Sequence, residues 1–136
     1  MSAFTISTTL AQPYESTVDA VRAALAEQGF GILTEIDLRA TLKAKLDVDV
    51  APQLILGACR PALAHEAITV DPSIAAVLPC NVVVRAVDDT TTVVEAFDPD
   101  AMTGLADNDA LRTVATDAKQ RLTAALASLT ATTVEG

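Results

Sequence analysis

The chain has 136 residues, of which 51% are hydrophobic, and it carries a formal net charge of −9 with an isoelectric point near 4.3. The length suits one domain with a sizeable core, and the hydrophobic content argues against disorder over most of the chain. Binding to the phosphate backbone of a nucleic acid depends on Lys and Arg, so the excess of acidic residues argues against nucleic-acid partners. The negative net charge also disfavours binding to anionic membrane surfaces.

The first six residues contain neither the basic region nor the apolar stretch of a secretory signal. No apolar run approaches the roughly 18 residues that a membrane span needs. We therefore expect a cytoplasmic protein whose thiols stay reduced. With three Phe, one Tyr and no Trp, its core should be aliphatic.

Alternating apolar residues predict a first strand over residues 4–10 and a second over residues 30–36. The helix between them is expected over residues 16–28, with Ser16 as its N-cap and Gly29 as the glycine that ends it. Asp37 is placed to cap a short helix that follows. That helix carries its leucines on one stripe, which consists of Leu38, Leu42 and Leu46.

Three further strands are predicted over residues 53–59, 81–87 and 91–97, and the last two form a hairpin across Asp88-Asp89-Thr90. Pro61 and Pro72 each suit the first position of a short helix between the third and fourth strands. A turn or short helix opens at Asp98-Pro99. The longest helical pattern covers residues 108–129, with one apolar face made of Leu111, Val114, Ala115, Ala118, Leu122, Ala125 and Leu129.

The resulting order, β-α-β-α-β-α-α-β-β-α, predicts a single α+β domain over residues 1–129. Its mainly antiparallel five-stranded sheet should be covered by helices on one side. Residues 130–136 are expected to form a frayed tail. Because the strand over residues 4–10 carries no charge that would protect a sheet edge, we expect a homodimer that pairs through a sheet edge or face.

Three segments resemble the bacterial and archaeal family called domain of unknown function 302: GFGILTEIDLRATLKAKL (29–46), LGACRPALAHEAI (56–68) and VLPCNVVV (77–84). FDPDAM (97–102) is similar to the Asp-Pro element that follows the family's last strand. The resemblance extends over residues 4–129 and implies a compact α+β fold with an antiparallel sheet, often as a dimer. It implies no activity. Cys59 and Cys80 match both family cysteines, whereas Asp88-Asp89 departs from the glycines usual in the hairpin turn, which bears on the turn geometry alone.

The two cysteines and the single histidine fall within residues 57–80. Cys59 ends a strand just before a helix start, where free N–H groups and Arg60 favour a thiolate, so its pKa is expected below the usual value near 8.5. Cys80 opens an apolar strand after a helix end and should be harder to ionise. If the third and fourth strands are antiparallel neighbours, the thiols lie close at one edge of the sheet; if they are parallel, the thiols lie at opposite edges.

Three interpretations of these thiols stay open. They are small buried hydrophobic residues, or a redox or sulfur-handling pair in which Cys59 attacks and Cys80 resolves, or ligands of a metal or haem. His65 would be a third metal ligand only if it turned back toward Cys59, and its place near the polar side of a helix favours a solvated position. Two cysteines and one histidine also fall short of the four ligands of structural zinc.

Gly31 and Gly57 lie inside strands, where glycine marks a bulge or a close approach of backbone or ligand. With Arg60 and His65, they are candidate pocket residues. Glu35 and Asp37 could form a carboxylate pair, but Asp37 is explained as a helix cap, and we assign no catalytic residue and no specific cofactor.

The sequence contains no phosphate-binding glycine loop, Ser-His-Asp order or spaced metal-ligand cluster. It favours a binding module for a small ligand or partner and leans away from an enzyme. A thiol protein that uses Cys59 and Cys80, and a metal or haem carrier that uses the same residues, are the alternatives.

Overall fold

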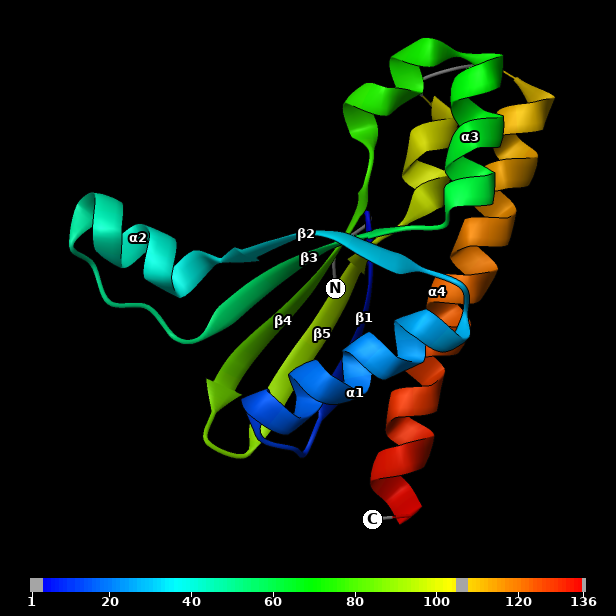
Figure 1. Cartoon of the computed structure of the whole chain (residues 1–136). Helices are drawn as coiled ribbons and strands as arrows, with labels where there is room; N and C mark the ends of the chain where they lie inside the picture. The colour runs from blue at the N-terminus through cyan, green and yellow to red at the C-terminus, as the bar shows by residue number, and fades with distance from the viewer. Residues whose placement is uncertain (1–3, 105–107, 136) are drawn as a thin grey trace.

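The computed structural model describes residues 4–104 and 108–135 (Figure 1). Its strands form one sheet in the spatial order β1-β5-β4-β3-β2, and every neighbouring pair is antiparallel. The strands are β1 (Thr5–Leu10), β2 (Gly31–Asp37), β3 (Gln53–Cys59), β4 (Cys80–Asp88) and β5 (Thr91–Phe97). The sheet confirms the predicted α+β fold.

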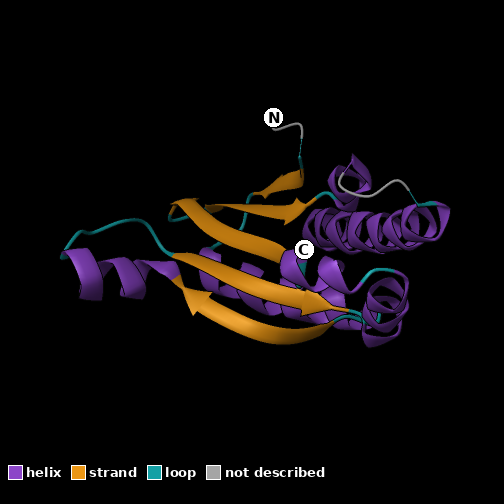
Figure 2. Cartoon of the chain, turned by 90° about the horizontal axis from the view of Figure 1, so that it is seen from above, coloured by secondary structure: helices purple, strands orange, loops and turns teal. Residues whose placement is uncertain are grey.

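The helices occupy one face of the sheet and its two ends (Figure 1). They are α1 (Tyr14–Glu27), α2 (Leu38–Leu46), α3 (Pro61–Val70) and α4 (Asp109–Glu135), with the 3-10 helices η1 (Pro72–Val77) and η2 (Pro99–Gly104). α1 and α4 pack against each other across one face, and α3, η1 and η2 gather at one end near the start of α4. Figure 2 shows α2 extending beyond the opposite end of the sheet, away from the other helices.

The first helix begins at Tyr14, two residues before Ser16, so the prediction that Ser16 is its N-cap is wrong. Pro13 occupies the N-cap position because its ring fixes φ near −61°. Proline has no side-chain acceptor, and the hydroxyls of the first turn instead donate back to its carbonyl. Ser16 Oγ and Thr17 Oγ1 lie 3.1 and 2.8 Å from the Pro13 oxygen.

Gly29 ends the first helix as predicted, with a φ of 86° that favours glycine. The Gly29 N–H donates to the Ala26 carbonyl, and the Phe30 N–H donates to the Leu25 carbonyl. These two hydrogen bonds form a Schellman motif, which turns the chain into β2 and buries Phe30 beneath it.

Asp37 caps α2 as predicted, since its Oδ1 accepts a hydrogen bond of 2.9 Å from the Ala40 N–H. The leucine stripe of α2 is only partly covered, however. Leu38 and Leu42 are half-buried, Leu46 is 66% exposed, and no residue of the helix is buried. The described part of this chain therefore leaves most of α2 without packing.

The main core lies between the sheet and the pair α1 and α4, and it is aliphatic as predicted. All seven residues of the predicted apolar face of α4 are buried. α4 extends to Glu135, past Leu129, because residues 130–135 contain no glycine or proline that would end it. The last residue of the expected tail, Gly136, lies outside the described residues.

A second, smaller hydrophobic cluster joins α3 and η1 to the start of α4. It consists of Ala67, Ile74, Leu111 and Val114, with Leu63, Val77 and Leu78 packed against it. As predicted, Pro61 and Pro72 stand at the starts of α3 and η1. The domain thus has two hydrophobic centres of unequal size.

The β4–β5 hairpin turns without glycine. Of the described residues, only Asp47 and Gly29 have a positive φ, so Asp89 and Thr90 turn the chain in ordinary conformations. Asp88 Oδ1 accepts a hydrogen bond of 2.9 Å from the Thr90 N–H, which lowers the pKa of the Asp88 carboxyl. The departure from the family's glycines is thereby accommodated by an aspartate side chain that stabilises the turn.

Candidate functional site: a cavity beside two thiols

The strand register places the two cysteines at neighbouring positions of β3 and β4. Ala58 pairs with Cys80 across β3 and β4, so Cys59 is the next residue along the ladder. α3 and η1 carry the chain away from the end of β3 and back to the start of β4, at the same edge of the sheet. The prediction that both thiols lie at one edge is confirmed, and both are free thiols.

A cavity of about 40 Å³ lies beside the thiols, between this end of the sheet, α3, η1 and α4. A single water needs about 10–15 Å³ measured in this way, so the cavity has room for a few atoms. Cys59, Cys80 and Arg60 contribute to its lining. The remaining wall is apolar and includes Phe30, Leu63, Leu78, Met102, Val114 and Ala118.

Burial raises the pKa of both thiols, so the prediction of a lowered Cys59 pKa is wrong. For Cys80, burial and then the nearby Cys59 raise the pKa to about 11. For Cys59, loss of water around the sulfur raises the pKa. The predicted order of acidity holds, because the larger rise belongs to Cys80.

Arg60 does not offset this rise because its guanidinium is held elsewhere. Its Nη1 lies 3.3 Å from Asp117 Oδ2 on α4. Its Nε lies close to the backbone of Gly29, since a Cβ added to Gly29 would be 2.9 Å from this Nε. Among the described buried side-chain polar atoms, this Nε is the one without a hydrogen-bond partner. Arg60 therefore connects the start of α3 to α4 and to the end of α1, and forms part of the cavity wall.

The family model for the domain of unknown function DUF302 matches residues 6–129, which is nearly the whole described domain. The chain belongs to this family. The crystal structure of an uncharacterized conserved DUF302 protein from Bacillus stearothermophilus is similar, with a TM-score of 0.82 and 26% sequence identity, and the match covers 92% of this chain and 97% of that one. No curated protein matches the chain.

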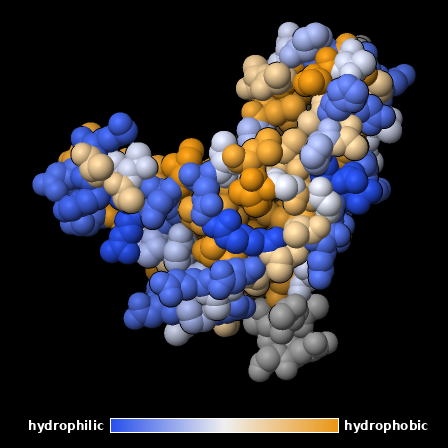
Figure 3. All heavy atoms as spheres, viewed as in Figure 1, coloured by the Kyte–Doolittle hydropathy of each residue, from blue (hydrophilic) through white to orange (hydrophobic). Residues whose placement is uncertain are grey.

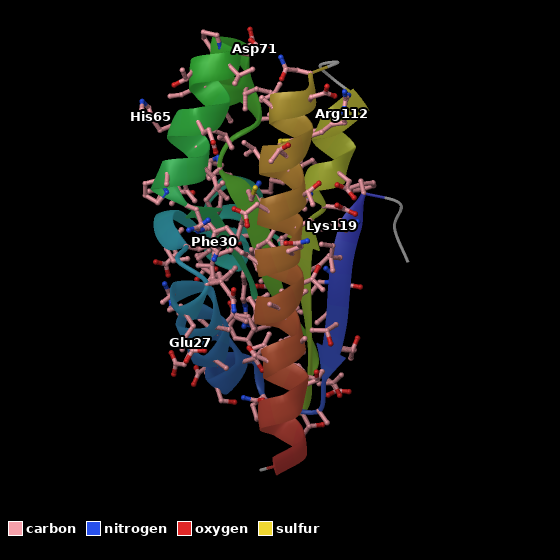
Figure 4. All side chains as sticks on the ribbon, turned by 90° about the vertical axis from the view of Figure 1, so that its right-hand side faces the viewer. Glu27, Phe30, His65, Asp71, Arg112 and Lys119 are labelled. Atoms are coloured by element: carbon pink, nitrogen blue, oxygen red, sulfur yellow. The ribbon has the colours of Figure 1, made fainter. Side chains whose placement is uncertain are left out.

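In this DUF302 domain, His65 does not join the thiols. It is exposed on α3, and Figure 4 shows it on the outer side of that helix, pointing away from α4. Within residues 4–104 and 108–135, no group of three or more His, Cys, Asp or Glu side chains could hold a metal ion. The cysteines and His65 therefore do not form a ligand set in the described structure.

Gly57 and Gly31 are not among the described residues that line the cavity. They differ from each other in the space available for a side chain. A Cβ on Gly57 would lie 2.1 Å from Thr34 Oγ1 and 2.7 Å from Pro79 Cγ, so glycine is required for close packing inside the protein. A Cβ on Gly31 would meet only the Cys59 carbonyl oxygen, at 3.9 Å. The bulge expected near these glycines lies between Ile32 and Thr34.

Glu35 and Asp37 have structural partners. Glu35 forms an ion pair with Arg22 of α1, and Asp37 caps α2. Both carboxylates are thus explained by the packing of β2 and its neighbours.

Most of the cavity wall was not found from the sequence. Phe30 follows the Schellman turn, Met102 belongs to the FDPDAM segment, and Val114 and Ala118 lie on the predicted apolar face of α4. Each residue belongs to a local sequence pattern that could be recognised by itself. Their convergence depends on the tertiary packing of three segments that lie far apart in the chain, which no local spacing encodes.

None of the helices in the described part of the chain combines the length and the apolar character that crossing a membrane requires.

Proposed function

We propose that this DUF302 domain binds a small, mainly uncharged ligand in the cavity beside Cys59 and Cys80. The observation that carries the proposal is the cavity itself. Small-ligand sites are mostly concave and apolar with a few polar groups, and this cavity has that character. A ligand that filled it would remove the apolar lining from water.

The chemistry of the wall supports a neutral ligand. The lining is apolar apart from the two thiols and Arg60. The positive charge of Arg60 is paired with Asp117, and its Nε is a buried donor without a partner in the described structure. The volume suits a molecule of a few heavy atoms or the apolar end of a longer one.

Xenon provides a probe of suitable size, because it enters dry apolar cavities. We expect xenon to shift the amide NMR signals of β3 and α3 residues that border the cavity. Ala118→Leu, which fills the cavity from α4, should abolish these shifts. Ala124→Leu makes the same change at an exposed site on the same helix and should preserve them. Shifts that are absent from the native protein, or that survive Ala118→Leu, would refute the proposal.

A thiol-based redox or sulfur-handling function is the second candidate, because two free thiols line the same cavity. In such a reaction the Cys59 thiolate would attack hydrogen peroxide, giving a sulfenic acid and hydroxide. The Cys80 thiol would then attack the sulfenic sulfur and release water, leaving a Cys59–Cys80 disulfide. Cys59 suits the attacking role because it is half-exposed, whereas Cys80 is buried.

A limiting amount of iodoacetamide should modify Cys59 before Cys80, and dilute peroxide should link the two, as detected by intact and peptide mass spectrometry. Cys59→Ser and Cys80→Ser are the matched controls, and each should abolish the link. If neither thiol reacts until the protein unfolds, both are packing residues. The metal or haem alternative has the least structural support, since His65 lies apart from the thiols; an absorption spectrum of the purified protein tests it directly.

A further inference from the structure

We propose that the ligand of the cavity is a small carbonyl compound, whose oxygen accepts a hydrogen bond from Arg60 Nε while its apolar part fills the remaining space. The inference rests on the proposed function, because it specifies the ligand of the same cavity. Arg60 lines that cavity, and its Nε is buried without a hydrogen-bond partner among the described residues. Buried polar groups nearly always have a partner, so a buried donor without one calls for an explanation.

Contacts with two other elements hold the Arg60 side chain in position. The side chain is 20% exposed, and its Nη1 lies 3.3 Å from Asp117 Oδ2 on α4. At the end of α1, a Cβ added to Gly29 would lie 2.9 Å from Arg60 Nε and 3.5 Å from Nη2, so glycine leaves this edge of the guanidinium uncovered by a side chain. A donor that is fixed before the ligand arrives loses little freedom on binding.

A second arginine beside the same carboxylate shows which atom Arg60 leaves unused. Asp117 also pairs with Arg121 on α4, and there the arginine Nε itself donates to Asp117 Oδ1 over 3.0 Å. Arg60 donates through Nη1, which leaves its Nε for another acceptor. Arg121 is not among the described residues that line the cavity. The two arginines therefore share one carboxylate, but only Arg60 has both an unused Nε and a place in the cavity wall.

The rest of the wall indicates the class of ligand. The other lining side chains are apolar except for the two thiols, which are weak donors. Figure 3 shows apolar side chains gathered where the sheet meets the part of the molecule formed by α3 and η1. A hydrocarbon would leave Arg60 Nε without a partner, and a charged group would lose its hydration in apolar surroundings. A carbonyl oxygen accepts the hydrogen bond and brings no net charge.

Three molecules of the same branched shape test this assignment: isobutene, acetone and acetate. Isobutene reports on the apolar space alone, acetone adds the carbonyl oxygen, and acetate adds a negative charge. Titration of the full chain, followed by the amide NMR signals of β3 and α3, measures the dissociation constant of each. We expect acetone and isobutene to shift these signals and acetate to leave them unchanged.

Arg60→Lys is the deciding variant. A lysine side chain has a methylene group at the position of Nε, and it keeps a positive charge that can pair with Asp117. The variant should weaken acetone binding about tenfold, which corresponds to about 1.4 kcal/mol, and should leave isobutene binding unchanged. Arg121→Lys is the matched control, since it makes the same change beside the same carboxylate but outside the cavity lining. It should leave both affinities unchanged.

The possible results separate this inference from the proposed function. Acetone that fails to bind, or that binds equally to the native protein and Arg60→Lys, would overturn the inference, and so would acetate that binds more tightly than acetone. In each of these cases, xenon and isobutene shifts would still support a cavity that takes apolar ligands. If xenon and isobutene cause no shifts in the native protein, the proposed function fails as well.

Discussion

Replacing Gly57 by alanine should destabilise the protein through a single added methyl group. That group would lie 2.1 Å from Thr34 Oγ1 and 2.7 Å from Pro79 Cγ, well inside contact distance. Thr34 is β-branched and Pro79 is a ring, so neither side chain can move far without distorting its own strand or turn. Overpacking of this kind costs about 1–3 kcal/mol, and we expect a loss of that size.

Urea unfolding followed by circular dichroism measures this loss, with Gly31→Ala as the matched control on the neighbouring strand. Its new methyl group would meet only a backbone oxygen at 3.9 Å, so stability should stay unchanged or rise by up to about 1 kcal/mol, because the unfolded chain loses freedom. Adding Thr34→Ala to Gly57→Ala should recover part of the loss, since the nearest clashing atom is removed. Equal stability of the Gly57→Ala and Gly31→Ala variants would refute the reasoning.

Two further predictions concern the core and the buried thiol. Leu122 is fully buried between α4 and the sheet, so Leu122→Ala should cost about 2–5 kcal/mol in urea unfolding, and a loss below that range would place the residue outside the core. The Cys80 thiol ionises at a pH near 9 when unfolded but only at about 11 when folded, so the unfolded chain binds fewer protons between these pH values. Stability should therefore fall by about 2–3 kcal/mol as the pH rises through this window, and Cys80→Ala should remove that part of the slope. An unchanged slope in the variant would show that Cys80 titrates normally.

The sequence was most informative where one residue determines the local backbone. Gly29 and Asp37 were predicted correctly as a helix end and a helix cap because each acts on atoms within three or four residues of itself. The prediction of Ser16 as the N-cap is wrong for a related reason. Pro13, with its fixed φ, determines where the helix begins. The five strands were recognisable because alternation and turn residues marked each one.

The candidate site was predictable only in part. The antiparallel order of β3 and β4 was enough to bring Cys59 and Cys80 to one edge. The Cys59 pKa was not predictable, because it depends on where the Arg60 side chain points, and that is decided by Asp117 on a distant helix. The cavity itself arises from side chains of separate elements, so its existence follows from packing and not from any motif.

The division of the core into two clusters has a consequence for access to the cavity. The larger cluster packs the sheet against α1 and α4, whereas the smaller one packs α3 and η1 against the start of α4. Segments with less buried apolar surface open locally at a lower free energy than the whole domain unfolds. The cavity borders this smaller cluster, so we expect the amides of α3 and η1 to exchange with solvent faster than those of the sheet, with local opening there widening access to the thiols.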